Sequence, residues 1–122
     1  MSVHKNFIAG EWIGSSDQVA NINPSDTNDI VGEYAQASRD QVNQAVDAAY
    51  AASVGWARSG IQQRCECLDA IGTEILARKR ELGTLLSREE GKTLAEGIGE
   101  AARAGQIFKF FAGEALRNAG EL

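Results

Sequence analysis

The sequence predicts an α-rich polypeptide in which short N-terminal β-strands or hairpins are followed by about four helices. Two observations lead to this fold class. The first 36 residues carry short apolar runs separated by turn-forming residues, and they contain the only proline, Pro24. From Ser38 onward, apolar residues recur at spacings of three and four, the period of an amphipathic helix. The length of 122 residues is that of one domain.

The β region, residues 1–36, contains two candidate strand pairs. Apolar pairs at 7–8 and 12–13 flank an Ala-Gly pair at 9–10, which is compatible with a tight hairpin turn. Alanine fits a turn position that needs positive φ less well than asparagine does. Further along, apolar runs at 19–22 and 29–34 bracket a stretch that is nearly all turn-forming residues.

Capping boxes mark three expected helix starts. The pattern of Ser or Thr followed three residues later by Gln or Glu occurs at Ser38 with Gln41, Ser59 with Gln62, and Thr93 with Glu96. We expect the first helix to end between Gly55 and Gly60. The second helical segment should stop at Gly91, because glycine accepts the left-handed cap conformation. A break of this segment near residues 78–80 is left open.

Glycines interrupt the last helical segment at positions 97, 99, 105 and 113. Each costs about 1 kcal/mol relative to alanine inside a helix. Such a cost indicates either close helix packing or room for a ligand, and packing is the commoner reason. Apolar residues, Phe108 and Phe111 among them, fall on more than one side of this segment, so we expect it to have neighbours on several sides.

Composition and charge exclude several classes of function. The chain is 43% hydrophobic and 24% charged, with a net charge of -5 and a pI of about 4.8. An acidic chain is a poor partner for nucleic acid or for an anionic membrane surface. No apolar run approaches the roughly 20 residues that span a bilayer, and Met1–Lys5 does not resemble the start of a signal peptide. We therefore expect a cytoplasmic protein with no nucleic-acid or membrane partner.

The two cysteines, Cys65 and Cys67, fall in an expected helix. Residues two apart on a helix point about 200° away from each other, so these thiols should not bridge. We expect Cys65 to be a small core residue and Cys67 to be half-exposed. A redox role is the weaker alternative, and a metal site is poorly supported because His4 is the only histidine.

Two further features have both a plain and a functional interpretation. Glu89 and Glu90 are solvated charges or, since carboxylates at a helix C-terminus oppose its dipole, part of an oxygen-rich cation site with Asn23 and nearby carbonyls. Arg103 lies between small residues of the last helix. Its guanidinium is either in water, or paired with Glu100 or Glu96, or directed into a cavity where it would hold a substrate carboxylate through two hydrogen bonds.

Four short motifs then suggest a family. In chain order they are Asn6-Phe7-Ile8-Ala9-Gly10-Glu11-Trp12, Asn23-Pro24-Ser25, Glu89-Glu90-Gly91-Lys92 and Phe110-Phe111-Ala112-Gly113-Glu114. Together they resemble the opening quarter of an aldehyde dehydrogenase. The resemblance implies an α/β fold in which residues 1–122 form the N-terminal part: a β region at 1–36 and, at 38–120, a helical layer of the cofactor domain.

The resemblance also implies roles for individual residues. Glu89 and the main chain at Ile22 would belong to the family's structural monovalent-cation site, although Asp is commoner than Glu at the first of these positions. Gly99 and Arg103 would face the aldehyde entrance tunnel. The run from Arg103 to Phe111 is similar to the group that oxidises α-ketoglutaric semialdehyde (2,5-dioxovalerate).

The resemblance places the chemistry outside this chain. The family's catalytic cysteine, glutamate base, oxyanion-hole asparagine and dinucleotide contacts all lie beyond position 122, and neither cysteine of the chain matches them. The expected function is therefore the N-terminal part of an NAD- or NADP-dependent dehydrogenase of an acidic semialdehyde, inactive alone. Its partners would be the aldehyde, the remainder of the enzyme and further copies in a dimer or tetramer. The alternatives are a free-standing helical interaction module and a truncated product.

Overall fold

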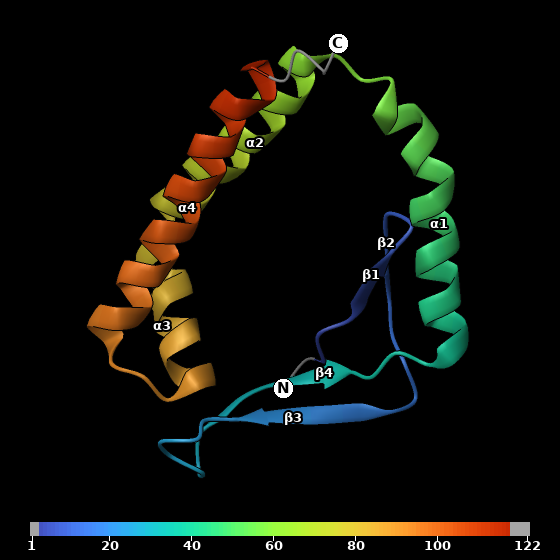
Figure 1. Cartoon of the computed structure of the whole chain (residues 1–122). Coiled ribbons are helices and arrows are strands. Elements are labelled where there is room, and N and C mark those ends of the chain that lie inside the picture. The colour runs from blue at the N-terminus through green and yellow to red at the C-terminus, as the bar shows by residue number, and fades with distance from the viewer. Residues whose placement is uncertain (1–2, 118–122) are drawn as a thin grey trace. The chain divides into compact units, whose positions relative to one another are not determined.

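The structure is a computed structural model that describes residues 3–117, which form four strands and four helices (Figure 1). The chain divides into two compact units, residues 1–58 and residues 59–122, and each is described by itself. Among the described residues, no helix is both long and apolar enough to cross a membrane. The predicted order of strands first and helices afterwards is confirmed.

The first hairpin pairs β1 (Asn6–Ile8) with β2 (Glu11–Ile13) in antiparallel register. Phe7 lies opposite Trp12, and their ring centroids are 4.9 Å apart. The turn places Ala9 at φ 52° and Gly10 at φ 89°. Two successive positive φ values are what a tight type I′ hairpin requires, so the predicted turn forms even though alanine is an unfavourable residue at its first position.

The second strand pair joins β3 (Gln18–Ile22) to β4 (Ile30–Ala35), again antiparallel, with a register irregularity between Asn21 and Ile22. The connection is held by its own polar side chains. Asn23 Nδ2 donates to Asp29 Oδ2 over 3.2 Å, and the Ser25 amide donates to Asn23 Oδ1 over 2.9 Å. Local hydrogen bonds of this type explain why Asn and Asp favour such turns.

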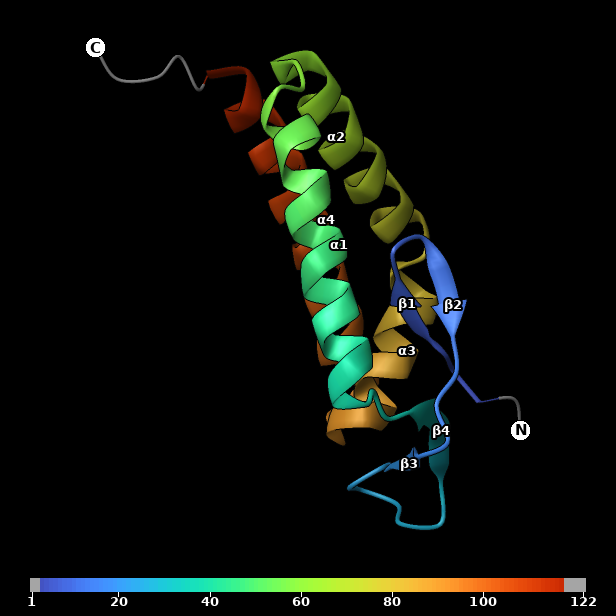
Figure 2. The ribbon, with the colours of Figure 1, turned by 90° about the vertical axis from the view of Figure 1, so that its right-hand side faces the viewer.

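Helix α1 (Arg39–Ala57) begins with the predicted capping box. The Gln41 amide donates to Ser38 Oγ over 3.2 Å, and the Ser38 amide donates to Gln41 Oε1 over 3.0 Å. The helix runs beside the β1–β2 hairpin (Figure 2). A shallow groove between the two is lined on the helix side by Ala45, Ala48, Ala49 and Ala52. The small alanine side chains therefore face the hairpin, whereas the larger apolar side chains of Val46 and Trp56 are exposed.

Helices α2 (Ile61–Ala77) and α3 (Lys79–Glu90) are separated at Arg78, which settles the open question of a break. The Arg78 guanidinium holds the Glu81 carboxylate through two hydrogen bonds, of 2.9 and 2.6 Å. It thus links the end of α2 to the first turn of α3. These contacts lower the pKa of Glu81.

The predicted capping box at Ser59 and Gln62 is wrong. The cap residue of α2 is Gly60, one position later, and its helix start has no side-chain cap. Ser59 Oγ instead accepts a hydrogen bond from Arg64 Nε over 3.0 Å, and Gln62 Nε2 donates to Glu66 over 2.9 Å. The charged Arg64 side chain thus donates to the Ser59 hydroxyl oxygen, which the predicted capping box expected to accept from a backbone amide.

Helix α4 (Leu94–Arg117) packs against both α2 and α3. Its buried stripe consists of small residues, namely Gly97, Ala101, Gly105 and Ala112. A Cβ atom at Gly72 would lie 2.9 Å from the Gly105 carbonyl oxygen, so the two backbones are too close for any larger side chain. Close packing, the commoner of the two predicted reasons, therefore explains Gly97 and Gly105. Positions 118–120 of the predicted helical layer lie outside the described residues.

Candidate functional site

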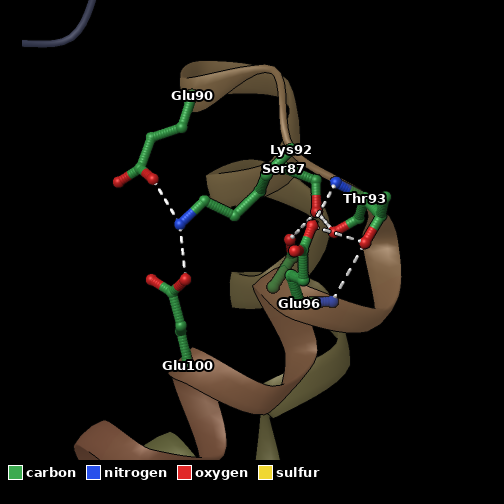
Figure 3. Close-up of polar contacts among 7 residues, drawn as sticks. Ser87, Glu90, Lys92, Thr93, Glu96 and Glu100 are labelled. Atoms are coloured by element: carbon green, nitrogen blue, oxygen red, sulfur yellow. Dashed lines mark hydrogen bonds and ion pairs between the residues drawn. The ribbon is translucent and has the colours of Figure 1, made fainter.

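The candidate site begins at the connection between α3 and α4. Gly91 caps α3 in the left-handed conformation, with φ 71° and ψ 20°, as predicted. Thr93 follows two residues later. The Glu96 amide lies 3.4 Å from Thr93 Oγ1, and the Thr93 amide donates to Glu96 Oε2 over 3.1 Å. The predicted third capping box is thus present (Figure 3). Hydrogen bonds from the Thr93 hydroxyl and amide lower the pKa of Glu96.

Lys92 lies between two carboxylates in this connection. Its ammonium is 2.5 Å from Glu100 Oε1 in α4 and forms a second ion pair with Glu90 at the end of α3 (Figure 3). The lysine side chain is only 21% exposed, compared with 48% for Glu90 and 54% for Glu100. Hydrogen bonds to Glu100 and then Glu90 raise the pKa of Lys92. The bridge joins two helices and keeps both carboxylates occupied.

An apolar groove of about 410 Å³ lies where the three helices of this unit meet. Its lining is contributed by Ile75, Leu82, Leu85, Leu86, Glu89, Glu100, Ala101 and Ala104. Two carboxylates therefore border an otherwise apolar surface. Of the predicted site residues, Glu89 lies at this groove, whereas Gly99 and Arg103 do not line it.

Gly99 and Arg103 lie on the opposite face of α4. They are each two positions away from the buried Ala101 or Gly105, which turns them about 200° from the packed stripe. Both are exposed, and a Cβ atom at Gly99 would have open space around it. One helical turn separates the two residues. The structure thus brings these two predicted substrate contacts together on one open face.

The acidic neighbours suggested for Arg103 have other partners. Glu96 is engaged by Thr93, and Glu100 is engaged by Lys92. Among residues 3–117, no carboxylate forms an ion pair with Arg103, so its guanidinium is not paired within the described chain. An exposed guanidinium of this kind can hold a carboxylate through a planar pair of hydrogen bonds.

The two residues predicted for a cation site belong to different units. Ile22 ends β3 in the first unit, next to the Asn23 turn, and Glu89 lies in the last turn of α3 in the second. Their association therefore remains a prediction. Within the described part of the chain, no three His, Cys, Asp or Glu side chains gather as a metal-binding group.

The histidine lies in the first unit and the two cysteines lie in the second. Both cysteines are free thiols, as expected from their helical spacing, but Cys65 is half-buried and not a core residue, and Cys67 is exposed and not half-exposed. His4 stacks on Tyr34 in the β region, with ring centroids 4.8 Å apart.

Sequence reasoning missed the role of Lys92. It precedes α4 and is eight positions from Glu100, so no helical spacing rule connects the two. The signal that was available is the adjacent left-handed glycine, because a sharp turn at Gly91 reverses the chain and brings Lys92 back toward α4.

The chain is similar in sequence to known proteins over nearly its whole length. The sequence model of the aldehyde dehydrogenase family matches residues 12–122. The α-ketoglutaric semialdehyde dehydrogenase of Bacillus subtilis is 37% identical over 99% of this chain and 25% of its own length. The corresponding protein of Haloferax volcanii is 36% identical over 91% of this chain and 23% of its own. The chain thus spans about a quarter of the length of these curated relatives.

A solved structure gives the same result for the fold. The betaine aldehyde dehydrogenase of Staphylococcus aureus, solved in complex with NAD+, superposes with a TM-score of 0.89 at 26% identity. The match covers 97% of this chain and 24% of that one. Strands and helices of the present chain therefore follow those of a much longer NAD-binding protein.

Proposed function

The chain belongs to the aldehyde dehydrogenase family, and on this premise we propose that it is the N-terminal part of an NAD(P)-dependent enzyme that oxidises an acidic semialdehyde. The proposed substrate class is that of α-ketoglutaric semialdehyde, the aldehyde that appears in the names of the two relatives described above. Arg103 and Gly99 form the part of the substrate site that this chain contributes.

The unpaired guanidinium of Arg103 is the observation that carries this proposal. It lies on the open face of α4, beside a glycine that leaves room for a ligand, and no described carboxylate neutralises it. An acidic semialdehyde has a carboxylate at the end remote from the aldehyde. Binding of that carboxylate at Arg103 would orient the aldehyde toward catalytic groups supplied by the rest of the enzyme.

Substitution of Arg103 in the complete enzyme tests the proposal. Arg103→Leu should raise the KM for α-ketoglutaric semialdehyde far more than the KM for a neutral aldehyde of equal length. Loss of a charge-assisted contact costs on the order of 1.5–3 kcal/mol, which corresponds to roughly ten- to a hundredfold. An equal rise in KM for both aldehydes would mean that Arg103 does not bind the substrate carboxylate, and it would contradict the proposed acidic substrate.

The remaining parts of the enzyme fit around this segment. NAD or NADP would be bound mainly by residues outside this chain, where the family resemblance also places the nucleophile and the base. Residues 38–120 would form a helical layer over the cofactor domain. Glu89 and the main chain at Ile22 would hold a structural monovalent cation. The enzyme would assemble as a dimer or tetramer of identical subunits.

A further inference from the structure

Arg103 has one acidic neighbour at helical spacing. The positions three and four residues away on either side are Gly99, Glu100, Gln106 and Ile107. A carboxylate three residues from an arginine on a helix surface is a favourable ion-pair partner. By spacing alone, Glu100 should therefore neutralise the guanidinium that the proposed function needs.

The structure shows a different partner for Glu100. Its carboxylate is directed toward the α3–α4 connection, where Lys92 Nζ lies 2.5 Å from Glu100 Oε1 (Figure 3). The lysine is held in place from the other side by Glu90. Because Lys92 is mostly covered and makes two ion pairs, it holds Glu100 in this orientation.

We propose that Lys92 is a positioning residue: it withdraws Glu100 from Arg103 and so keeps the guanidinium available for a substrate carboxylate. This inference rests on the proposed role of Arg103 and adds to it the reason why the site stays open. Without Lys92, Glu100 becomes an internal competitor for the same guanidinium. A tethered carboxylate competes at high effective concentration, so the substrate has to displace it.

Kinetics of the complete enzyme test the inference. Lys92→Met should raise the KM for α-ketoglutaric semialdehyde about two- to fivefold, the range that a surface ion pair supports. The value of kcat and the KM for a neutral aldehyde of equal length should change less. Lys92→Arg, which keeps the charge, should retain a KM near that of the unsubstituted enzyme.

Two double variants separate positioning from general stabilisation. Lys92→Met with Glu100→Gln should restore the original KM, because the competitor is removed. Lys92→Met with Glu90→Gln should leave the KM raised, since Glu90 is not a helical neighbour of Arg103. A KM unchanged by Lys92→Met, or a rise that Glu100→Gln does not reverse, would overturn the inference.

Parallel KM measurements on Arg103→Leu show whether the role of Lys92 alone is wrong or the proposed substrate class is wrong as well. If Arg103→Leu discriminates between acidic and neutral aldehydes while Lys92→Met has no effect, only the positioning role of Lys92 is wrong. If Arg103→Leu affects both aldehydes equally, the proposed substrate class fails and this inference fails with it.

Discussion

Arg103 and the residues around it show how individual charges are distributed in this chain. Each acidic residue close to it in sequence on α4 is already engaged, Glu96 by the capping box and Glu100 by Lys92. The guanidinium is the group left over. The proposed function places the substrate carboxylate at this guanidinium, whose planar fork can form two hydrogen bonds with it.

The capping carboxylate of α4 should make stability depend on pH. The pKa of Glu96 in the folded chain lies below its ordinary value of 4.5, so the ionised form is the one that stabilises the fold. The stabilisation by ionised Glu96 is complete at pH values above 4.5, and it is lost as the pH falls through the lowered pKa of the folded chain. We expect wild type to exceed Glu96→Gln in free energy of unfolding at neutral pH, and the difference to shrink below about pH 4.5. Urea unfolding of both proteins across pH measures this. A difference that stays constant with pH would contradict it.

The hairpin turn contains a residue that is not suited to its conformation. Ala9 has φ 52°, and the left-handed region costs an L-residue about 1–2 kcal/mol of conformational energy. Glycine avoids this cost but lowers the folding stability by about 0.4–1 kcal/mol, because its unfolded chain has more conformational entropy. Ala9→Gly should therefore stabilise the chain by about 0.5–1 kcal/mol, and Ala9→Val should destabilise it, because β-branching makes positive φ worse. Urea midpoints of the three proteins check the order. A midpoint for Ala9→Gly below that of Ala9 would show that the turn is not strained.

Some side-chain partners were predictable from local patterns. Thr93 and Glu96 form the capping box that their spacing indicates, and Cys65 and Cys67 stay apart as a helix requires. The partner of Glu100 was not predictable in this way, because Lys92 reaches it across a turn. A spacing rule describes neighbours within one helix and does not include a residue that precedes it.

At the scale of elements, glycine decides how α4 packs. Two contacts bring helix backbones together, Gly72 with Gly105 and Gly83 with Gly97. A Cβ atom at Gly97 would overlap the Gly83 carbonyl oxygen, and one at Gly105 would lie 2.7 Å from Leu76 Cγ. A carbonyl in the facing helix cannot turn aside as a flexible side chain can. These glycines therefore set the distances from α4 to α2 and to α3.

Alanine substitutions within α4 test this directly. Gly97→Ala should destabilise the chain by about 1–3 kcal/mol, the usual cost of overpacking. Gly99→Ala is the matched control, because position 99 is open and alanine has the higher helix propensity by about 1 kcal/mol. The urea midpoint should fall for the first variant and rise for the second. Equal shifts in the same direction would mean that helix propensity, and not close packing, governs both positions.

Element boundaries followed from the sequence except where a charged side chain intervened. The strands, α1 and the cap at Gly91 lie where turn residues and capping patterns placed them. The start of α2 does not, because Arg64 takes the Ser59 hydroxyl and the cap moves to Gly60. The break at Arg78 is stabilised by hydrogen bonds from the Arg78 guanidinium to Glu81. The spacing of apolar residues does not predict such polar contacts.

At the scale of the whole molecule, the chain matches about a quarter of each curated relative described above. Its last helix leaves aromatic surface uncovered: Phe110 is 62% exposed and Phe111 is 54% exposed. The prediction that this helix has neighbours on several sides is therefore not fulfilled by the described residues alone. In the complete enzyme that we propose, the cofactor and catalytic regions would supply those neighbours.

The family was evident from sequence because its signals are short motifs in a fixed order. The proposed substrate site was only partly predictable: Gly99 and Arg103 are on one exposed face, and the proposal assigns the other groups of the site to residues outside this chain. The predicted cation site would need residues from both units, and it stays a prediction.

Reduction of NAD+ is the measurement that tests the central claim most directly. The isolated 122-residue chain and the complete enzyme are each mixed with NAD+ and α-ketoglutaric semialdehyde, and formation of the reduced cofactor is followed by absorbance. We expect reduction by the complete enzyme and none by the isolated chain, because the proposal assigns substrate recognition to this segment and the chemistry to other residues. Reduction of NAD+ by the isolated chain above the enzyme-free rate would contradict the account.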